Sequence, residues 1–392
     1  MLSRAQSSPI GNWWWTIDRW LLGALGLLMV LGVMLSMAAS PAVAERIGLT
    51  TFHFVNRQII YLGIAIPVLL GTSFLSPRYV RRAALALFTF ALGLILITVL
   101  HRVEIKGASR WIFGIQPSEF VKPAFVILAA WAFSEGSRRK DVPGTWLGFA
   151  LLPLTIIPLL MQPDFGQTML LTIVWATLVI LAGLRWLWIA GLGGVGAAAV
   201  LLAYKFVPHV RGRILKFLEP GQGNGGDSFQ VDTAIESFTH GSWLGTGPGE
   251  GTVKRILPDS HTDFIFAVTG EEFGIIAAMG LSLIFAFIVI RGLMLASRNE
   301  DPFARFAASG LLVLFGIQAC INMSVNLHLM PAKGMTLPFI SYGGSSLISL
   351  ALTMGFLVAV TRKRPRSEIV ADITRGMEDD ILNETRTNGV TA

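Results

Sequence analysis

Charged side chains are scarce in this sequence. Asp, Glu, Lys and Arg make up 14% of its 392 residues, whereas they make up about 25% of a typical soluble domain. Hydrophobic residues, in contrast, make up 53% of the chain. This composition excludes a soluble globular domain and indicates an integral membrane protein.

Cysteine is nearly absent as well. The single cysteine, Cys320, lies inside an apolar run, so the chain cannot form an intrachain disulfide. The sequence also lacks the spacing of histidine, cysteine and carboxylate residues that is typical of a metal site. The formal net charge is +7, but the basic residues are spread through short loops. They do not gather on one aromatic-studded face, which argues against a nucleic-acid partner.

Long apolar runs recur through the chain, and a membrane-spanning helix needs about 20 mainly apolar residues. The runs predict spans at residues 19–40, 55–75, 83–101, 117–134, 145–161, 167–183, 186–207, 264–290, 303–329 and 341–361. The predicted fold is therefore an all-α integral membrane protein with about ten transmembrane helices. One long outer loop, at about residues 208–261, joins the seventh span to the eighth.

Basic residues gather on alternate connections between these spans. They are Arg78, Arg81, Arg82, Arg138, Arg139, Lys140, Arg185, Arg291, Arg298, Arg305, Arg362, Lys363, Arg364 and Arg366. The positive-inside rule places such connections in the cytoplasm, so the long loop faces outward. Residues 1–18 then form a cytoplasmic segment, residues 19–361 the membrane domain, and residues 362–392 a disordered cytoplasmic tail.

The stretch at residues 257–274 begins polar and continues as an apolar run, which places the carboxylate of Asp263 at the edge of the bilayer. Ser260 and Asp263 also fit a helix capping box, in which Asp263 would receive backbone N–H groups. The two interpretations are compatible. A carboxylate fixed at a helix start is also well placed for acid–base chemistry on a substrate at the membrane surface.

Two cations, Arg110 and Lys122, lie on the predicted outer side, against the positive-inside bias. They could anchor the chain at the interface, with Lys122 reaching outward from its helix. Alternatively they bind an anionic ligand. A lysine inside an apolar helix costs about 2.5 to 3.5 kcal/mol to insert, so it needs a partner such as Glu119, Asp164 or a bound phosphate.

The loop at residues 331–346 is rich in glycine, proline and serine, and we interpret it as an outer loop folded back into the protein. It contributes Lys333 and Ser341 to the predicted substrate site, together with His261 from the polar stretch. The long loop carries apolar side chains, among them Trp243 and Leu244, that could lie against the membrane or a partner.

Five motifs, in this order, carry a resemblance to a known family: KGASRWI, QPSEFVK, QPDFGQT, LPDSHTDFIFAVTGEEFG and PFISYGGSS. The chain resembles the SEDS family (shape, elongation, division and sporulation) over nearly the whole membrane region. Residues 333–338 resemble the division branch more than the elongation branch. The chain departs from the family pattern at Asp259, where many members have Glu, and at residues 249–251.

The resemblance implies a bacterial enzyme that polymerises lipid II, the lipid-linked peptidoglycan precursor, at the outer face of the cytoplasmic membrane at the division septum. By the same resemblance Asp263 matches the proposed catalytic carboxylate, and Arg110 and Lys122 match important basic residues. These basic residues would stabilise the departing pyrophosphate. A divalent cation, Mg²⁺ or Mn²⁺, could share that task, held mainly by substrate phosphates. The implied protein partner is a single-span class B penicillin-binding protein, a transpeptidase.

Three functions remain open on the sequence: a glycosyltransferase, a transporter that flips the same lipid, and a non-catalytic scaffold for division proteins. A flippase would place its essential charges along a path through the membrane. Arg110, Lys122 and Asp263 are instead all predicted near the outer side. A scaffold would tolerate the loss of all three.

Overall fold

The computed structural model describes residues 8–101, 111–112, 114–139, 141–183, 186–206, 211–212, 215, 226–331 and 334–363. Two predicted site residues, Arg110 and Lys333, lie outside these ranges. Within them the regular structure is helical. The α-helices are α1 Pro9–Thr16, α2 Arg19–Arg46, α3 His53–Ser73, α4 Pro77–His101, α5 Pro117–Arg138, α6 Gly144–Met161, α7 Phe165–Leu181, α8 Trp186–Phe206, α10 Gly226–Gly241, α11 Ile265–Ser297, α12 Pro302–Asn326 and α13 Gly344–Thr361.

Each of the ten predicted spans corresponds to one of these helices, from α2 to α8 and from α11 to α13. Seven helices in the described ranges are long and apolar enough to cross a membrane, namely α2, α3, α4, α6, α11, α12 and α13. The prediction of an all-α integral membrane protein is confirmed. The helix ends differ from the predicted ends by several residues, because hydropathy does not register the polar turns that extend a helix beyond the bilayer.

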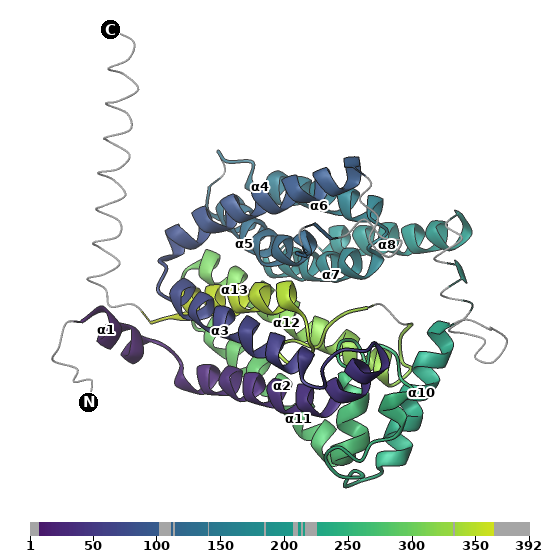
Figure 1. The fold of residues 1–392 in the computed structure, drawn as a ribbon. Helices are drawn as coiled ribbons and strands as arrows, with labels where there is room; N and C mark the ends of the chain where they lie inside the picture. The colour runs from purple at the N-terminus through teal and green to yellow at the C-terminus, as the bar shows by residue number, and fades with distance from the viewer. Residues whose placement is uncertain are drawn as a thin grey trace.

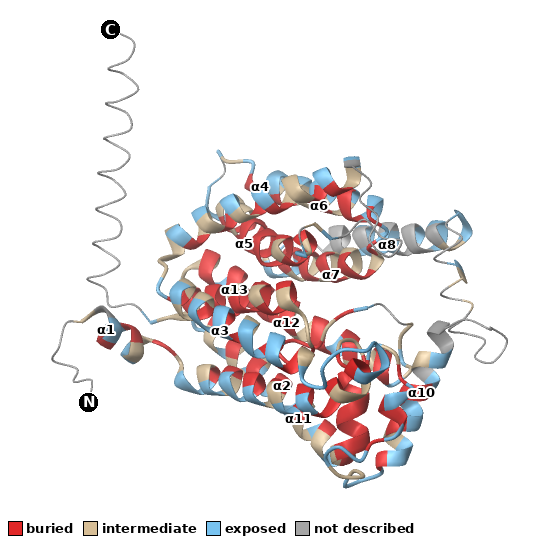
Figure 2. Ribbon diagram, in the orientation of Figure 1, coloured by how far each residue is buried: buried red, intermediate tan, exposed pale blue. Residues whose placement is uncertain are grey.

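The helices pack in layers. In Figure 1, α4 and α6 lie above α5 and α7, then come α13 and α12, and α2 and α11 lie below. Helix α5 contacts α4, α6, α7, α12 and α13, and most of its side chains are buried. Figure 2 shows burial concentrated in these central helices, whereas α2, α3, α4 and α6 expose one face. That distribution is expected when the outer helices face lipid and a central helix is apolar on all sides.

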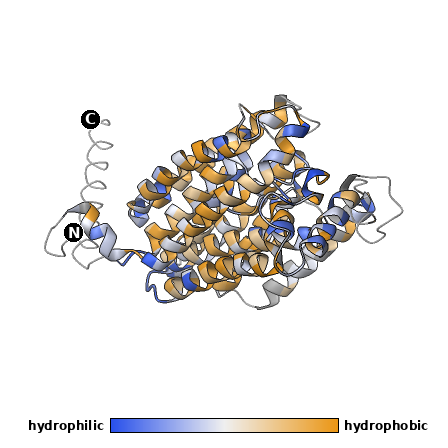
Figure 3. Ribbon diagram, turned by 60° about the horizontal axis from the view of Figure 1, so that its bottom comes forward, coloured by the Kyte–Doolittle hydropathy of each residue, from blue (hydrophilic) through white to orange (hydrophobic). Residues whose placement is uncertain are grey.

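The helices are hydrophobic along their middles, and hydrophilic residues collect at their ends and in the loops (Figure 3). At one end of the bundle α1 packs against the ends of α3 and α13. There Trp13 Nε1 donates to Ser73 Oγ at 2.8 Å, and the backbone N–H of Lys363 donates to Thr16 O at 3.0 Å. The first and last described segments therefore meet on the same side of the molecule.

The long loop is folded in its described part. It contains α10, the short 3-10 helix Val253–Arg255, and turns that pack on the start of α11. Phe238 of α10 lies 5.6 Å from the ring of Phe266, whereas Trp243 and Leu244 remain exposed. The loop thus forms a small cap over the N-terminal end of α11.

Helix α11 is two helices joined at Gly274, whereas the sequence predicted a single span at residues 264–290. Gly274 has φ 80° and ψ 173°, a backbone conformation open to glycine. A Cβ atom there would lie 2.3 Å from the carbonyl oxygen of Trp243, so the loop also needs a glycine for close approach. Residues 265–273 form a short helix buried on nearly all sides, and residues 275–297 form an apolar helix with one buried and one exposed face.

Candidate active site

Buried polar side chains gather at one end of the bundle, where α5, α7, α11 and α13 begin and α12 ends. Helix α12 supplies Gln318, Asn322 and Asn326, all buried and spaced four residues apart. Residues at this spacing share one face of a helix. We call these three residues the amide row. They were missed at the sequence level, although three amides at this interval in an apolar helix are a detectable signal.

The amide row holds two loops together. Asn322 and Asn326 each donate a side-chain N–H to the backbone carbonyl of Asp263 at 2.9 Å. Asn322 also donates to the carbonyl of Met335 at 2.6 Å. Asn326 accepts from the backbone N–H of Ala267 at 3.1 Å. The backbone of Asp263 is therefore fixed by α12, while its carboxylate is left out of these bonds.

The turn before α11 does not form the predicted capping box. The residue at the N-cap position is Phe264, and it makes no side-chain cap hydrogen bond. Asp259 instead closes the turn in a left-handed conformation, φ 52°, and its carbonyl accepts from the N–H groups of Thr262 and Asp263 at 3.0 and 3.1 Å. The Ser260 hydroxyl is buried without a partner in the described structure. Asp263 is thus not a helix cap, and that interpretation is wrong.

The carboxylate of Asp263 makes no hydrogen bond or ion pair with any residue in the described ranges. It faces the loop before α13, where a Cβ atom built on Gly334 would lie 3.5 Å from Asp263 Oδ2. Burial raises the pKa of Asp263 from 3.8 to about 7, and the negative charge of Asp259 adds to the shift. A carboxylate that titrates near neutral pH is suited to accept a proton.

A buried ion pair lies on the other side of the amide row. Lys122 Nζ lies 2.8 Å from Glu119 Oε2, and it donates to Gln318 Oε1 at 3.0 Å. The amide of Gln318 in turn donates to the carbonyl of Thr336 at 3.1 Å. Glu119 was one of the partners predicted for Lys122. Lys122 is 2% exposed, so it points into the protein and does not reach outward as an interfacial anchor.

The polar network continues from Glu119 to the start of α7. Gln167 donates its side-chain N–H to Glu119 Oε1 at 2.9 Å. Asp164 is the N-cap of α7, where its side chain accepts from the backbone N–H of Gln167 at 3.4 Å. Asp164 therefore lies in the interior, as predicted, and the structure brings Asp164, Glu119 and Lys122 into one connected cluster.

The loop before α13 is fastened to the turn that carries Asp263. The Ser341 hydroxyl donates to the carbonyl of Thr262 at 2.5 Å and accepts from the N–H of Leu337 at 2.7 Å. The N–H of Tyr342 donates to the carbonyl of His261 at 3.0 Å. The folded-back outer loop is therefore a wall of the site, and Ser341 is one of its fasteners.

The side chain of His261 lies in an aromatic box. Its ring centroid is 4.2 Å from that of Phe54 and 5.6 Å from that of Tyr342. Burial lowers the pKa of His261 to about 4, although the charge of Asp259 opposes the shift. The imidazole is consequently neutral at pH 7.

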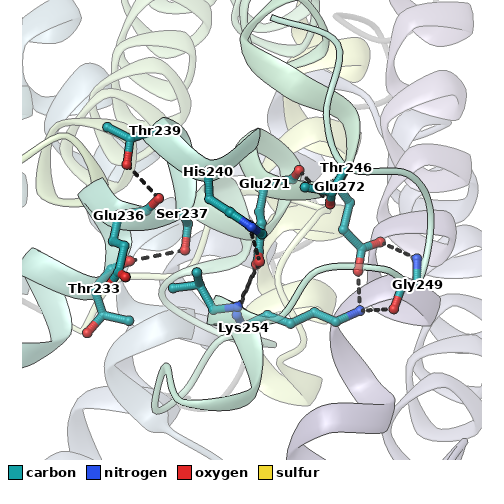
Figure 4. A network of polar contacts seen from close by, with 11 residues as sticks. Thr233, Glu236, Ser237, Thr239, His240, Thr246, Gly249, Lys254, Glu271 and Glu272 are labelled. Carbon is teal, nitrogen blue, oxygen red and sulfur yellow. Dashed lines mark hydrogen bonds and ion pairs between the residues drawn. The ribbon is translucent and has the colours of Figure 1, made fainter. Parts of the chain in front are cut away.

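A second buried charge cluster holds the long loop on α11 (Figure 4). Glu271 accepts from the backbone N–H groups of Val253 and Lys254 at 2.7 and 2.9 Å, and His240 Nδ1 lies 3.3 Å from the same carboxylate. Lys254 pairs with Glu272 and donates to the carbonyl of Ala38 on α2. We call Lys254, Glu271 and Glu272 the loop clamp. It fixes the chain segment that leads into Asp263.

The structure thus assembles most of the predicted site. Asp263, His261, Ser341, Lys122, Glu119 and Asp164 lie at the same end of the bundle. The amide row and the loop clamp are additions that the sequence did not predict. Among the described residues, no group of three His, Cys, Asp or Glu side chains is arranged to hold a metal ion.

The fold and the site define a polytopic helical membrane protein with a titratable carboxylate at one end of its bundle. The family model described as "Cell cycle protein", which covers FtsW, RodA and SpoVE, matches residues 18–366. The chain belongs to this family, the SEDS proteins. It is 46% identical to the "Probable peptidoglycan glycosyltransferase FtsW" of Caulobacter vibrioides, over 93% of this chain and 94% of that protein. It is 34% identical to the protein of the same name in Pseudomonas fluorescens, over 87% and 86%.

Solved structures have the same fold. One is a chain from a study entitled "Structural coordination of polymerization and crosslinking by a peptidoglycan synthase complex". It matches with a TM-score of 0.73 and 26% identity, over 88% of this chain and 97% of that chain. The rod shape determining protein RodA of Thermus thermophilus matches with a TM-score of 0.65 and 25% identity, over 89% and 98%.

Proposed function

We propose that this chain polymerises lipid II into glycan strands, with Asp263 as the general base. Its membership of the FtsW branch makes it a peptidoglycan glycosyltransferase. In the proposed reaction a sugar hydroxyl of the acceptor attacks the anomeric carbon of the donor. The new C–O bond forms as the bond to the polyprenyl diphosphate breaks. The hydroxyl proton passes to the Asp263 carboxylate, and the diphosphate leaves with its electron pair.

The observation that carries the proposal is the state of Asp263. Its backbone is fixed by two amides of α12, yet its carboxylate is unengaged within the described residues and has a pKa of about 7. A structural carboxylate would be expected to make hydrogen bonds that lower its pKa. Fixed position with a raised pKa is the combination that general-base catalysis requires.

The cations would stabilise the leaving diphosphate. Lys122 has three N–H donors, of which Glu119 and Gln318 engage two, so one remains for a phosphate oxygen. Lys333 precedes Gly334, which lies beside Asp263, and we assign it and Arg110 to the same anionic groups. Developing negative charge is best stabilised by donors that are fixed before the reaction.

The remaining predicted residues would position the substrate and the walls of the site and would take no direct part in the reaction. Asp164 and Glu119 hold the cationic side of the site, and Ser341 fastens its wall. A neutral His261 in its aromatic box would offer a face for a sugar ring. Mg²⁺ or Mn²⁺, if used, would be held mainly by substrate phosphates.

We place the site at the outer face of the bacterial cytoplasmic membrane, with both termini in the cytoplasm, and at the septum. Support comes from the basic residues at the opposite end of the bundle, including Arg138, Arg298 and Arg362. A transpeptidase of the class B penicillin-binding type is the proposed partner. The similar fold within a complex that couples polymerisation to crosslinking supports this, as do the exposed Trp243 and Leu244 of the long loop.

The test is polymerisation of purified lipid II by Asp263→Asn, which keeps the size of the side chain and removes the base. We expect glycan formation to fall at least about a hundredfold without a fall in the melting temperature. Glu250→Gln is the matched control, because Glu250 is an exposed carboxylate in the same loop region. A folded Asp263→Asn protein that polymerises at the parent rate would refute the assignment. If that variant instead loses transfer of lipid II across vesicles, the flippase alternative is correct.

A further inference from the structure

A pocket of about 790 Å³ lies at the end of the bundle opposite Asp263. Its walls come from the start of α4, the end of α5, the α11–α12 connection and the end of α13. Asp263 precedes α11 and Arg298 follows it, so the length of that helix separates the pocket from the active site. The proposed polymerase reaction does not use this pocket.

Cationic side chains dominate the lining of the pocket. They are Arg78, Arg81, Arg138, Arg298, Arg362 and Lys363, whereas the acidic lining residues are Glu300 and Asp301. The positive charges of Arg78 and Arg138 repel the guanidinium of Arg81, which Glu135 and Asp301 attract. The pocket therefore holds an excess of positive charge in a confined space.

Some of these cations have structural roles. Arg138 forms an ion pair with Asp301 at 3.0 Å, and Arg81 lies 3.6 Å from Glu135 and stacks over the ring of Phe303 at 4.1 Å. These contacts hold two of the guanidinium groups in place at the wall of the pocket. Structural pairing accounts for both of them without any ligand.

Three of the other cations are not accounted for in this way. Arg78, Arg298 and Lys363 have no carboxylate within ion-pair distance among the described residues, although Glu300 lines the same hollow. Arg298 also follows the C-terminus of α11, where a cation complements the helix dipole. That effect explains a cation at one helix end. It does not explain why three unpaired cations from three different connections converge on one pocket.

We propose that this pocket binds the headgroup of an anionic lipid that carries two phosphate groups. The surplus of positive charge suits a polyanion better than a single phosphodiester. The pocket lies at the ends of five helices, where we expect the lipid headgroups of the cytoplasmic leaflet to lie, and Leu295, Ala304 and Ala359 give it apolar walls beside the charges. Basic pockets between the ends of transmembrane helices are the usual sites for such headgroups.

The test is native mass spectrometry of the purified full-length protein, titrated with cardiolipin, phosphatidylglycerol or phosphatidylcholine. We expect cardiolipin to remain bound at the lowest concentration. The triple variant Arg78→Gln, Arg298→Gln, Lys363→Gln should need at least about tenfold more cardiolipin for the same occupancy. Its melting temperature without lipid should match that of the parent, because these side chains form no ion pair within the described ranges.

The matched control is Arg82→Gln. Arg82 is an exposed cation on the same helix as Arg78 and stacks over Tyr79 outside the pocket, so its loss changes net charge without changing the lining. It should bind cardiolipin as the parent does. Equal binding by the triple variant and the parent would overturn the proposal, and so would equal binding of phosphatidylcholine.

Two further experiments distinguish a lipid headgroup from the other anions that could fill the pocket. Soluble pyrophosphate should displace cardiolipin, and if pyrophosphate alone raises the melting temperature as much as the lipid does, the pocket takes a free diphosphate. Deletion of residues 367–392 removes the acidic residues of the tail. A gain of about tenfold in cardiolipin affinity on deletion would show that the tail fills the pocket, which would refute a lipid as the natural occupant.

Discussion

At the scale of single residues, Asp263 and its neighbour Asp259 form an electrostatic pair across one turn. Asp259 lies in an exposed left-handed position. Burial, as the larger cause, and the charge of Asp259 together raise the pKa of Asp263 to about 7. We therefore expect the charge of Asp259 to tune the pKa of the proposed base.

Polymerase activity should therefore depend on pH with the sign of a base. The active carboxylate form of Asp263 increases as pH rises through about 7, so the rate should rise to a plateau above that pH. Asp259→Asn removes a negative neighbour and should shift the rise to lower pH. The measurement is the initial rate of lipid II polymerisation between pH 5 and 9, which covers about two pH units on either side of the expected transition. An unshifted profile in Asp259→Asn would contradict the electrostatic coupling.

The same shift affects stability in the opposite direction. Because the pKa of Asp263 is higher in the folded protein than its ordinary value of 3.8, ionisation opposes folding, and stability is lost as pH rises from about 4 to about 7. Asp263→Asn cannot ionise. Its melting temperature relative to the parent should thus increase over this range, which differential scanning fluorimetry at several pH values can measure.

The ion pair between Lys254 and Glu272 is a second residue-scale feature with a clear consequence. Both side chains are buried, and removing one partner of a buried pair costs about 3 to 5 kcal/mol because the other charge is left alone. Glu272→Gln should lower the melting temperature. The double variant Lys254→Met, Glu272→Gln should recover part of the loss, and a double variant less stable than Glu272→Gln would show that the pair is not the cause.

At the scale of elements, α12 organises the site through the amide row. Asn322 donates to the carbonyls of both Asp263 and Met335, so it joins the turn before α11 to the loop before α13. Each bond contributes only about 1 kcal/mol. The positions of the two loops relative to each other nevertheless depend on these bonds.

Asn322→Ala should reduce polymerisation more than it reduces stability. A displacement of about 1 Å in a catalytic group can lower a rate about a hundredfold, whereas the protein has many other contacts that maintain the fold. Cys320→Ala on the exposed side of the same helix is the control and should behave as the parent. The polymerisation rate and the melting temperature should be measured for both variants. If Asn322→Ala lost rate and stability to a similar extent, Asn322 would have only a packing role.

The elements were predictable because a span is a local property of about 20 residues, and all ten predicted segments are helices. The contacts that build the site are not local. Lys122 meets Gln318, which lies 196 positions away, and no periodicity in the sequence pairs them. The break at Gly274 was also hidden, because the apolar segment predicted as one span, residues 264–290, runs through it. The capping-box prediction was wrong because the carbonyl of Asp259 closes the turn and α11 begins later than that pattern requires, with Phe264 at its N-cap position.

At the scale of the whole molecule, the two ends of the bundle differ in chemistry. One end holds the amide row and Asp263, and the other holds the cationic pocket. The positive-inside rule assigns the pocket end to the cytoplasm. Because the helices form one bundle, the side of the membrane that each end faces can be tested with one residue at each end.

Single cysteines in the Cys320→Ala background provide that test. Leu244 is 81% exposed at the Asp263 end, and Arg305 is exposed near the pocket end. In intact spheroplasts, a membrane-impermeant maleimide should label Leu244→Cys and should not label Arg305→Cys until the membrane is permeabilised. The reverse pattern would invert the proposed topology and place the site in the cytoplasm.

The division of α11 at Gly274 sets the height at which the proposed chemistry takes place. Residues 275–297 alone extend about 34 Å at 1.5 Å per residue, enough to cross a hydrocarbon layer of about 30 Å. The buried short helix at residues 265–273 is therefore not needed to cross the bilayer, and we expect Asp263, which precedes it, to lie level with lipid headgroups. The sugars and diphosphate of a lipid-linked substrate occupy that same level. A growing strand could then move past the carboxylate by lateral diffusion of its lipid anchor within one leaflet. The prenyl chains would stay in the hydrocarbon layer while the glycosidic bond forms.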